Sequence, residues 1–398
     1  MPMQLHQDAP RLQVPDRAEE TAKMKIDRAT WAGQAFARYD RAAVMRIARA
    51  VAEAGHAAAT QFAEAAVAET GMGVVADKVL KNQLSAHPLV DFYENLDLVS
   101  PKVDAERRMI ELPRPAGVVL ALTPATNPVS TLYYKTILAI LSRNAILFSP
   151  HPMARRCCNA AAARLAAAAE AAGAPSGLIQ CIEEPSVPLV QALMGSAKVQ
   201  VILATGGGPM VRAAYSSGNP AIGVGPGNAP VYVDPGTDQT VAARRIIDSK
   251  AFDNSVLCTN ESVLISQERD RSRLERALRA GGAHICSEAD VAKLRDWLFP
   301  GGHLNTAAVG KSAVWIAGQA GLRVVGTTRV LVAPVALVGI DEPLTREKLC
   351  PVLGWALVSS AAHAASMAQM ILRMTGAGHS AAIHTDDPQL ALDFASAL

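Results

Sequence analysis

Short apolar segments alternate with helical segments through residues 116–208, and this alternation constrains the fold more than any other feature of the sequence. Helical stretches of about ten or more residues separate these segments, as is typical of a parallel sheet with helices on both faces. The pattern predicts Rossmann-like architecture, in which ligands lie at the carboxyl ends of the strands. The segments read as buried strands are AGVVLALTP (116–124), NAILFSPHP (144–152), GLIQCIE (177–183) and KVQVILATGGG (198–208).

The length of 398 residues predicts two domains. Residues 1–20 are polar and interrupted by prolines, so we expect a flexible arm there. Residues 21–233 form the first predicted domain, which is helical to about residue 95 and has a proline-bounded, hairpin-like segment at 98–115. Residues 234–398 form a second α/β domain, with strands expected at 262–267 and near 324–334 and 380–387.

Composition excludes several classes of protein. The net charge is only +2 and aromatic residues make up 4% of the chain, so a dedicated nucleic-acid binder is not expected. The six cysteines form no CxxC pair and no zinc-type cluster, which argues against a metal site and a disulfide framework and suits a reducing cytosol. The N-terminal residues lack the apolar core of a signal peptide, so none is expected there, and the longest apolar run, 160–174, is too short and polar to cross a bilayer. We expect a soluble cytoplasmic protein.

Two glycine-rich segments follow the last strand of the first domain. In LATGGGPMVRAAYSSG (203–218), three glycines separate a strand from a helix that begins near Pro209, a turn at which backbone N–H groups can approach a phosphate. The spacing is not G-x-G-x-x-G, so a tight turn without a ligand is the alternative. The segment GVGPGNAP (223–230) predicts an irregular loop whose backbone is closely approached by another group. The alternative is a simple crossover loop.

Two single residues are candidates for chemistry. A lone cysteine in an apolar stretch is usually an inert core residue, but Cys258 in KAFDNSVLCTNES (250–262) has polar neighbours of the kind that a thiolate needs. Asn127 lies in the proline-flanked loop LTPATNPVST (122–131). An asparagine there is most often a turn former, yet its amide is also a suitable donor to a developing oxyanion.

Taken together, these segments resemble the coenzyme A-acylating aldehyde dehydrogenases, above all the acetaldehyde dehydrogenase half of bifunctional aldehyde-alcohol dehydrogenases. The similarity runs from about Thr21 to the last residue. The matching stretches are AETGMGVVADKVLKN (68–82), TPATNPVSTLYYK (123–135), RNAILFSPHP (143–152), LATGGGPMVRAAYSSGNPAIGVGPGN (203–228), FDNSVLC (252–258), REKLCPVL (346–353) and GHSAAIHTD (378–386).

The resemblance implies an aldehyde dehydrogenase-like α/β fold, with a nicotinamide cofactor domain at 21–233, an oligomerisation hairpin at 98–115 and a catalytic domain at 234–398. It implies that Cys258 is the nucleophile and that Asn127 and the backbone N–H of Cys258 stabilise the oxyanion. Glu347 would hold the nicotinamide ribose and His379 would lie near the active site, although a solvated carboxylate and a structural loop histidine are the simpler interpretations. The implied cofactor contacts also include Leu122, Thr123, Pro124, Ala125, Thr126, Asn127, Gly207 and Gly225.

The acyl acceptor is expected to be coenzyme A rather than water. Hydrolytic aldehyde dehydrogenases carry a Glu-Leu-Gly-Gly motif whose glutamate activates water. The corresponding stretch here is Gly223-Val224-Gly225-Pro226, and no Asp or Glu occurs between Glu184 and Asp234. The reaction would start from a short aldehyde such as acetaldehyde, propionaldehyde or sulfoacetaldehyde. The alternative is a hydrolytic enzyme with a base from elsewhere.

Three further expectations concern cofactor choice, assembly and length. Arg155 and Arg156 follow a strand-end loop where a ribose 2′-phosphate of NADP could be met, but exposed helix arginines are the simpler interpretation, so we expect NAD. The resemblance implies a homo-oligomer, a dimer or a dimer of dimers. The family's catalytic domain usually continues several dozen residues beyond the equivalent of Leu398. The chain is therefore expected to be a C-terminally shortened member, with a catalytically impaired nucleotide-binding paralogue as the third interpretation.

Overall fold

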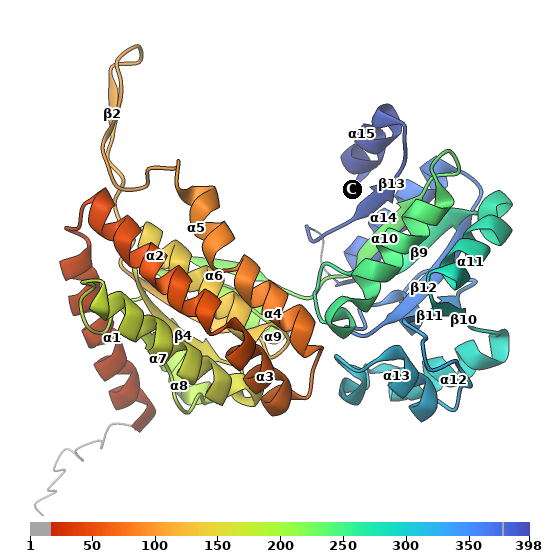
Figure 1. The fold of residues 1–398 in the computed structure, drawn as a ribbon, viewed down its shortest axis with the longest axis horizontal. Coiled ribbons are helices and arrows are strands. Elements are labelled where there is room, and N and C mark those ends of the chain that lie inside the picture. Colours follow the sequence, from red (N-terminus) through yellow and green to blue (C-terminus); the bar gives the residue numbers. More distant parts are fainter. Residues whose placement is uncertain (1–16, 376–377) are drawn as a thin grey trace, which may run out of the picture.

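The structure, a computed structural model, describes residues 17–375 and 378–398 and contains two bodies, each built on a parallel sheet (Figure 1). Most of the predicted N-terminal arm, residues 1–16, lies outside the described residues. Residues 17–20 of that arm form the first turn of helix α1 (Arg17–Phe36). The expected fold class, a Rossmann-like domain followed by a second α/β domain, is confirmed.

The first body holds a five-stranded parallel sheet with the order β5-β4-β3-β6-β7. Its strands are β3 (Val118–Thr123), β4 (Ala145–Pro150), β5 (Ile179–Cys181), β6 (Val201–Thr205) and β7 (Ala221–Val224). Strands β3 and β4 are buried along their whole length, which explains why their sequences are almost entirely apolar.

Besides α1, the helices of the first body are α2 (Arg41–Ala57), α3 (Ala59–Thr70), α4 (Val75–Leu84), α5 (His87–Tyr93), α6 (Pro128–Leu141), α7 (Arg155–Ala171), α8 (Val187–Met194) and α9 (Gly208–Tyr215). Helix α1 packs against α8, whereas α2 packs against α6 and α7. All of these helices except α4 contribute buried apolar residues to one hydrophobic core with the sheet.

The second body holds a six-stranded parallel sheet with the order β10-β11-β12-β9-β8-β13. Its strands are β8 (Ala229–Val233), β9 (Glu261–Gln267), β10 (Ala283–Ile285), β11 (Val330–Pro334), β12 (Val352–Val358) and β13 (Ala382–His384). Its helices are α10 (Gln239–Ala251), α11 (Arg271–Ala280), α12 (Glu288–Leu298), α13 (Ala313–Gln319), α14 (Ala361–Thr375) and α15 (Pro388–Ala397).

Two boundaries differ from the sequence-based expectation. Because β8 pairs with β9 and β13, the break between the sheets falls at residues 225–228 and not at 233/234. The prediction of an irregular loop at 223–230 is wrong at both ends, since Gly223 and Val224 pair with the end of β6 and residues 229–230 begin β8. The hydrogen bonds of an edge strand outweigh the low strand propensity of glycine at this position.

The segment 98–115 contains an antiparallel hairpin of β1 (Lys102–Asp104) and β2 (Met109–Glu111). Figure 1 shows this hairpin projecting from the first body, away from both sheets. Val103 and Ile110 on it are 72% and 64% exposed, although both side chains are apolar. In the described part of the chain, no helix combines the length and the apolar character needed to cross a bilayer.

Candidate active site

The strand order of the first sheet reverses direction between β3 and β6, which lie side by side and parallel. The chain runs from β3 outward to β4 and β5, and then returns to the other side of β3 with β6. Such a reversal of direction is where open α/β sheets bind ligands. The loops that leave β3 and β6, residues 124–127 and 206–207, therefore lie at the predicted ligand edge.

Asn127 precedes helix α6, and Pro128 opens that helix. Proline is favoured at the first helical position because its missing N–H would have no partner there. The Asn127 side chain does not cap its own helix, and its Nδ2 instead donates to the carbonyl of Val256 at 3.1 Å. Val256 lies two residues before Cys258 in the second body. The Asn127 amide therefore reaches across the junction between the two bodies.

The six predicted cofactor residues at 122–127 are not equally accessible. Leu122 and Thr123 belong to β3 and are buried in the sheet, and Ala125 in the following loop is also buried, so their side chains are not exposed at this edge. The carbonyl of Leu122 accepts a hydrogen bond from the buried Lys135 at 2.8 Å. Only the side chains of the half-buried residues Pro124, Thr126 and Asn127 can touch a ligand directly.

The predicted cofactor glycines, Gly207 and Gly225, border open space. A Cβ on Gly225 would meet nothing within 4 Å, and one on Gly207 would meet only the Pro209 ring, at 3.9 Å. The packing of the protein itself therefore does not require glycine at either position. Gly207 directly precedes helix α9, whose first backbone N–H groups point toward this edge.

Cys258 follows helix α10 through a turn of left-handed backbone. Asp253, Asn254 and Ser255 have φ angles of 49°, 50° and 62°. For residues other than glycine this conformation costs about 1–3 kcal/mol each, and such strain concentrates at functional sites. All six cysteines lie in the described residues, and Cys258 is the one that is not buried.

Gly227 is the point at which Cys258, Glu347 and His379 meet. A Cβ on Gly227 would lie 2.5 Å from the carbonyl oxygen of Cys258 and 2.8 Å from the His379 ring, so only glycine fits there. The N–H of Gly227 donates to Glu347 Oε1 at 3.0 Å. Cys258 and Glu347 also line one small cavity of about 10 Å³. The close approach that the glycine-rich segment predicted is thus made, at Gly227, by the protein's own residues.

The charges around this cavity oppose ionisation of the resting thiol. Burial raises the pKa of the Cys258 thiol, and the nearby Glu347 carboxylate raises it further. Burial also raises the pKa of Glu347 to about 7, against the opposing effects of the Gly227 N–H and Lys250. Burial lowers the pKa of Lys250, which lines the same cavity, to about 8. Both groups therefore titrate close to neutral pH.

The electrostatic coupling between Glu347 and Cys258 leads to a first prediction. Glu347→Gln removes a negative charge beside the thiol, so the thiol pKa should fall and alkylation by iodoacetamide at pH 8 should become faster. The measurement is the alkylation rate of Cys258 against pH, which the five buried cysteines do not obscure. Glu275→Gln, on helix α11, is the control for a lost carboxylate elsewhere. An alkylation midpoint that stays in place in Glu347→Gln would contradict the coupling.

The structure adds two lysines, and their pairing with an aspartate near Cys258, that sequence reasoning missed. Lys78 and Lys81 on helix α4 both contact the carboxylate of Asp253, and Lys81 also contacts Asn127. Their signal in the sequence was two lysines three residues apart in ADKVLKN. No local pattern pairs them with an aspartate more than 170 positions away.

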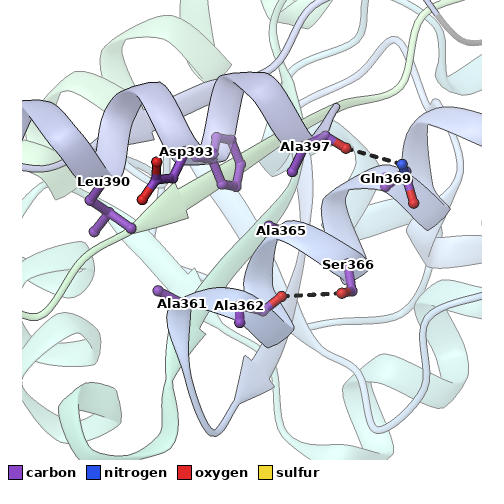
Figure 2. Close-up of a pocket in the computed structure, with 9 residues that line it drawn as sticks. Ala361, Ala362, Ala365, Ser366, Gln369, Leu390, Asp393 and Ala397 are labelled. Atoms are coloured by element: carbon purple, nitrogen blue, oxygen red, sulfur yellow. Dashed lines mark hydrogen bonds between the residues drawn. The ribbon is translucent and has the colours of Figure 1, made fainter.

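Other parts of the molecule offer less chemistry. A groove between α14 and α15 is lined by four alanines together with Ser366, Gln369, Leu390, Asp393 and Phe394 (Figure 2). It shares no lining residue with the cavity beside Cys258. Within residues 17–375 and 378–398, no group of three or more His, Cys, Asp or Glu side chains could hold a metal ion.

A comparison with protein families decides which family this arrangement represents. The model of the aldehyde dehydrogenase family matches residues 5–285, more than half of the chain. The chain belongs to the aldehyde dehydrogenase family. Its curated relatives place it in the coenzyme A-acylating branch, whose members are NAD(P)-dependent aldehyde oxidoreductases.

Among these acylating relatives, the aldehyde-alcohol dehydrogenase of Clostridium acetobutylicum is 38% identical over 88% of this chain. This chain spans only 41% of the length of that relative. The succinate-semialdehyde dehydrogenase (acetylating) of Clostridium kluyveri is 36% identical, over 93% of this chain and 82% of its own length.

Solved aldehyde dehydrogenase structures agree with this fold. The acetylating aldehyde dehydrogenase of Geobacillus thermoglucosidasius superposes with a TM-score of 0.92 at 36% identity, covering 95% of this chain and 84% of its own. The propionaldehyde dehydrogenase of Rhodopseudomonas palustris, solved with bound CoA and an acylated cysteine, has a TM-score of 0.85 at 28% identity and covers 94% and 85%. An engineered glycolyl-CoA reductase with bound NADP⁺ gives the same values.

Proposed function

We propose that this chain oxidises a short-chain aldehyde with a nicotinamide cofactor and passes the acyl group to coenzyme A through a thioester on Cys258. The observation that carries the proposal is the meeting of two chain segments from different sheets. The Asn127 amide donates to the backbone beside Cys258, which places an oxyanion donor next to the one partly exposed thiol.

The proposed chemistry has two stages. The Cys258 thiolate adds to the aldehyde carbonyl carbon, and the oxyanion that forms is stabilised by Asn127 Nδ2 and the backbone N–H of Cys258. NAD(P)⁺, which the loops at Gly207 and Gly225 would hold at the carboxyl edge of the first sheet, would supply the acceptor for the hydride on this carbon. The thiol of coenzyme A then attacks the thioester: its sulfur bonds to the acyl carbon, the bond to Cys258 breaks, and the proton of the coenzyme A thiol ends on the released Cys258 sulfur.

The residues at the carboxyl edge of the first sheet leave room for the cofactor and carry no charge that would repel its phosphates. Gly207 and Gly225 leave room for close approach, and the stretch 185–233 between the two acids Glu184 and Asp234 contains no carboxylate that would repel a pyrophosphate. We propose NAD rather than NADP, since Arg155 and Arg156 already pair with Glu184 and Glu69. Among the predicted cofactor residues, Glu347 would accept from a ribose hydroxyl.

A hydrolytic enzyme is the second candidate, and one observation favours it. Glu347 borders the cavity beside Cys258, and its pKa of about 7 suits a general base for water. Against it, Glu347 is engaged with the Gly227 N–H, and the Gly225-Pro226 stretch provides no carboxylate of the usual hydrolytic type.

One assay separates the two functions. Purified protein is mixed with acetaldehyde, propionaldehyde or succinate semialdehyde and with NAD⁺ or NADP⁺, with and without coenzyme A, and the reduced cofactor is followed. We expect sustained turnover only with coenzyme A. Equal turnover without coenzyme A that is lost in Glu347→Gln would establish the hydrolytic function instead. A folded protein without turnover under any of these conditions would overturn both.

We also propose that the chain forms a homo-oligomer, a dimer or a dimer of dimers, through the hairpin of β1 and β2. Its exposed apolar side chains, including Val103 and Ile110, lie on a two-stranded ribbon that would gain stability from further pairing. Light scattering at micromolar concentration should give a multiple of the chain mass, and the mass of a single chain would refute the proposal.

A further inference from the structure

A buried charge cluster joins the two bodies beside the proposed site. Lys78 and Lys81 lie one turn apart on helix α4, and their exposed fractions are 3% and 8%. Both approach the same carboxylate oxygen of Asp253, which is completely buried in the left-handed turn before Cys258. The carboxylate of Asp77 accepts from the backbone N–H of Asp253 at 2.7 Å. Two buried ammonium groups thus share one carboxylate, and Asp77 adds a second negative charge near Lys81, which offsets the cost of burying the charges.

The two lysines differ in what else they contact. Lys78 Nζ donates to the backbone carbonyl of Thr126 at 2.9 Å, a group that any residue at that position would offer. Lys81 Nζ donates to the side-chain Oδ1 of Asn127. Lys81 is therefore the member of the cluster that touches the proposed oxyanion donor itself.

The contacts of Asn127 fix the orientation of its amide. An ammonium group can only donate and a backbone carbonyl can only accept. Lys81 on one side and the carbonyl of Val256 on the other therefore place Oδ1 toward helix α4 and Nδ2 toward the Cys258 loop. The second Nδ2 proton has only a long contact with Thr126, at 3.3 Å, and remains available for an oxyanion. Donation by a cation to Oδ1 also polarises the amide and strengthens Nδ2 as a donor.

We propose that Lys81 is a positioning residue for the reaction: held by Asp253 of the second body, it orients and polarises the Asn127 amide so that Nδ2 faces the carbonyl attacked by Cys258. This inference rests on the proposed function. It explains why Asp253 is held in a left-handed turn, since that turn brings its carboxylate to helix α4. It also makes the oxyanion site a product of the docking of the two bodies.

Lys78 provides an internal control for this role. It shares the helix, the burial and the Asp253 oxygen with Lys81, but it does not contact Asn127. Lys78→Met therefore measures what is lost when the cluster is loosened. Lys81→Met measures the same loss together with the loss of amide positioning.

The experiment is a double-mutant cycle in the full chain, with kcat and KM measured in the coenzyme A-dependent assay and stability by thermal unfolding. We expect Lys81→Met to lower kcat about 10- to 100-fold more than Lys78→Met, with KM for the cofactor little changed. In the Asn127→Ala background, Lys81→Met should cost no more than Lys78→Met does. Lys81→Arg keeps a buried cation opposite Asp253 and should recover part of the loss, and if the methionine variant does not fold, the cycle is completed with arginine.

Equal losses in Lys78→Met and Lys81→Met, or an undiminished Lys81 effect in the Asn127→Ala background, would show that the cluster is only structural and would overturn the inference. Those outcomes leave the proposed function standing, because the wild-type chain would still turn over with coenzyme A. A wild-type chain without turnover would overturn the function, and the inference with it.

Discussion

Cys258→Ala is expected to abolish coenzyme A-dependent turnover, with a loss of at least about 10³-fold, because no other group can take over the covalent step. The other five cysteines are buried, and burial raises the pKa of Cys181, Cys286 and Cys350 to about 12, 12 and 11. Loss of the Cys258 Sγ removes no hydrogen bond that supports the fold, so thermal stability and cofactor binding should survive.

The measurement for Cys258 combines kinetics with intact-protein mass spectrometry. Wild-type protein incubated with acetyl-CoA should gain the mass of one acetyl group, which hydroxylamine removes, whereas Cys258→Ala should gain none. Cys286→Ala is the matched control, since Cys286 is a buried thiol in the core of the second body and does not line the cavity beside Cys258. Acylation or turnover that persists in Cys258→Ala would refute the assignment of the nucleophile.

Asn127→Ala should lower kcat about 10²- to 10³-fold, the loss typical for removal of one oxyanion donor. The substrate would still bind and Cys258 would still be present, so the loss should appear in kcat more than in KM. Asn82→Ala is a suitable control. Asn82 is also buried and lines one small cavity with Asn127, but its Nδ2 donates to the carbonyl of Ala59 at 3.0 Å and not to the Cys258 loop.

A comparison of these two asparagine variants separates stability from catalysis. Both should lower thermal stability, because each leaves a carbonyl without its donor. Only Asn127→Ala should lower kcat well beyond what its loss of folded protein explains. Similar kcat values in the two variants would show that Asn127 acts only as a turn former, the role that its proline-flanked position alone favours.

The fold was largely predictable because its sheets are buried on both faces. Strands such as β3 and β4 are apolar throughout and are bounded by turns, so the pattern identified both their type and their parallel arrangement. The errors lie where pairing with a neighbouring strand, and not the local amino-acid composition, determines the structure. Gly223 and Val224 form an edge strand only because β6 is beside them, and β8 belongs to the second sheet only because β9 is its neighbour.

The sequence singled out residues that the structure brings near one another, and their roles stay predictions, but the contacts that support these residues were not predicted. Resemblance in several segments pointed to Cys258, Asn127, Glu347 and His379, and the structure brings these segments together around the two-body junction. The charge cluster of Lys78, Lys81 and Asp253 was missed because a lysine in a helical sequence is normally predicted to be exposed to solvent. Its burial depends on a contact that exists only when both bodies have folded.

The break between the two sheets at residues 225–228 also makes the chain a template for protein engineering. The residues before this break include Asn127 and those after it include Cys258, so the two residues belong to bodies with separate sheets. A cut between Val224 and Gly225 would yield two fragments, of which neither contains a complete oxyanion site. Fused to two proteins that bind each other, such fragments would recover acyl transfer only on association, and the chain would then act as a split reporter with a thioester as its signal.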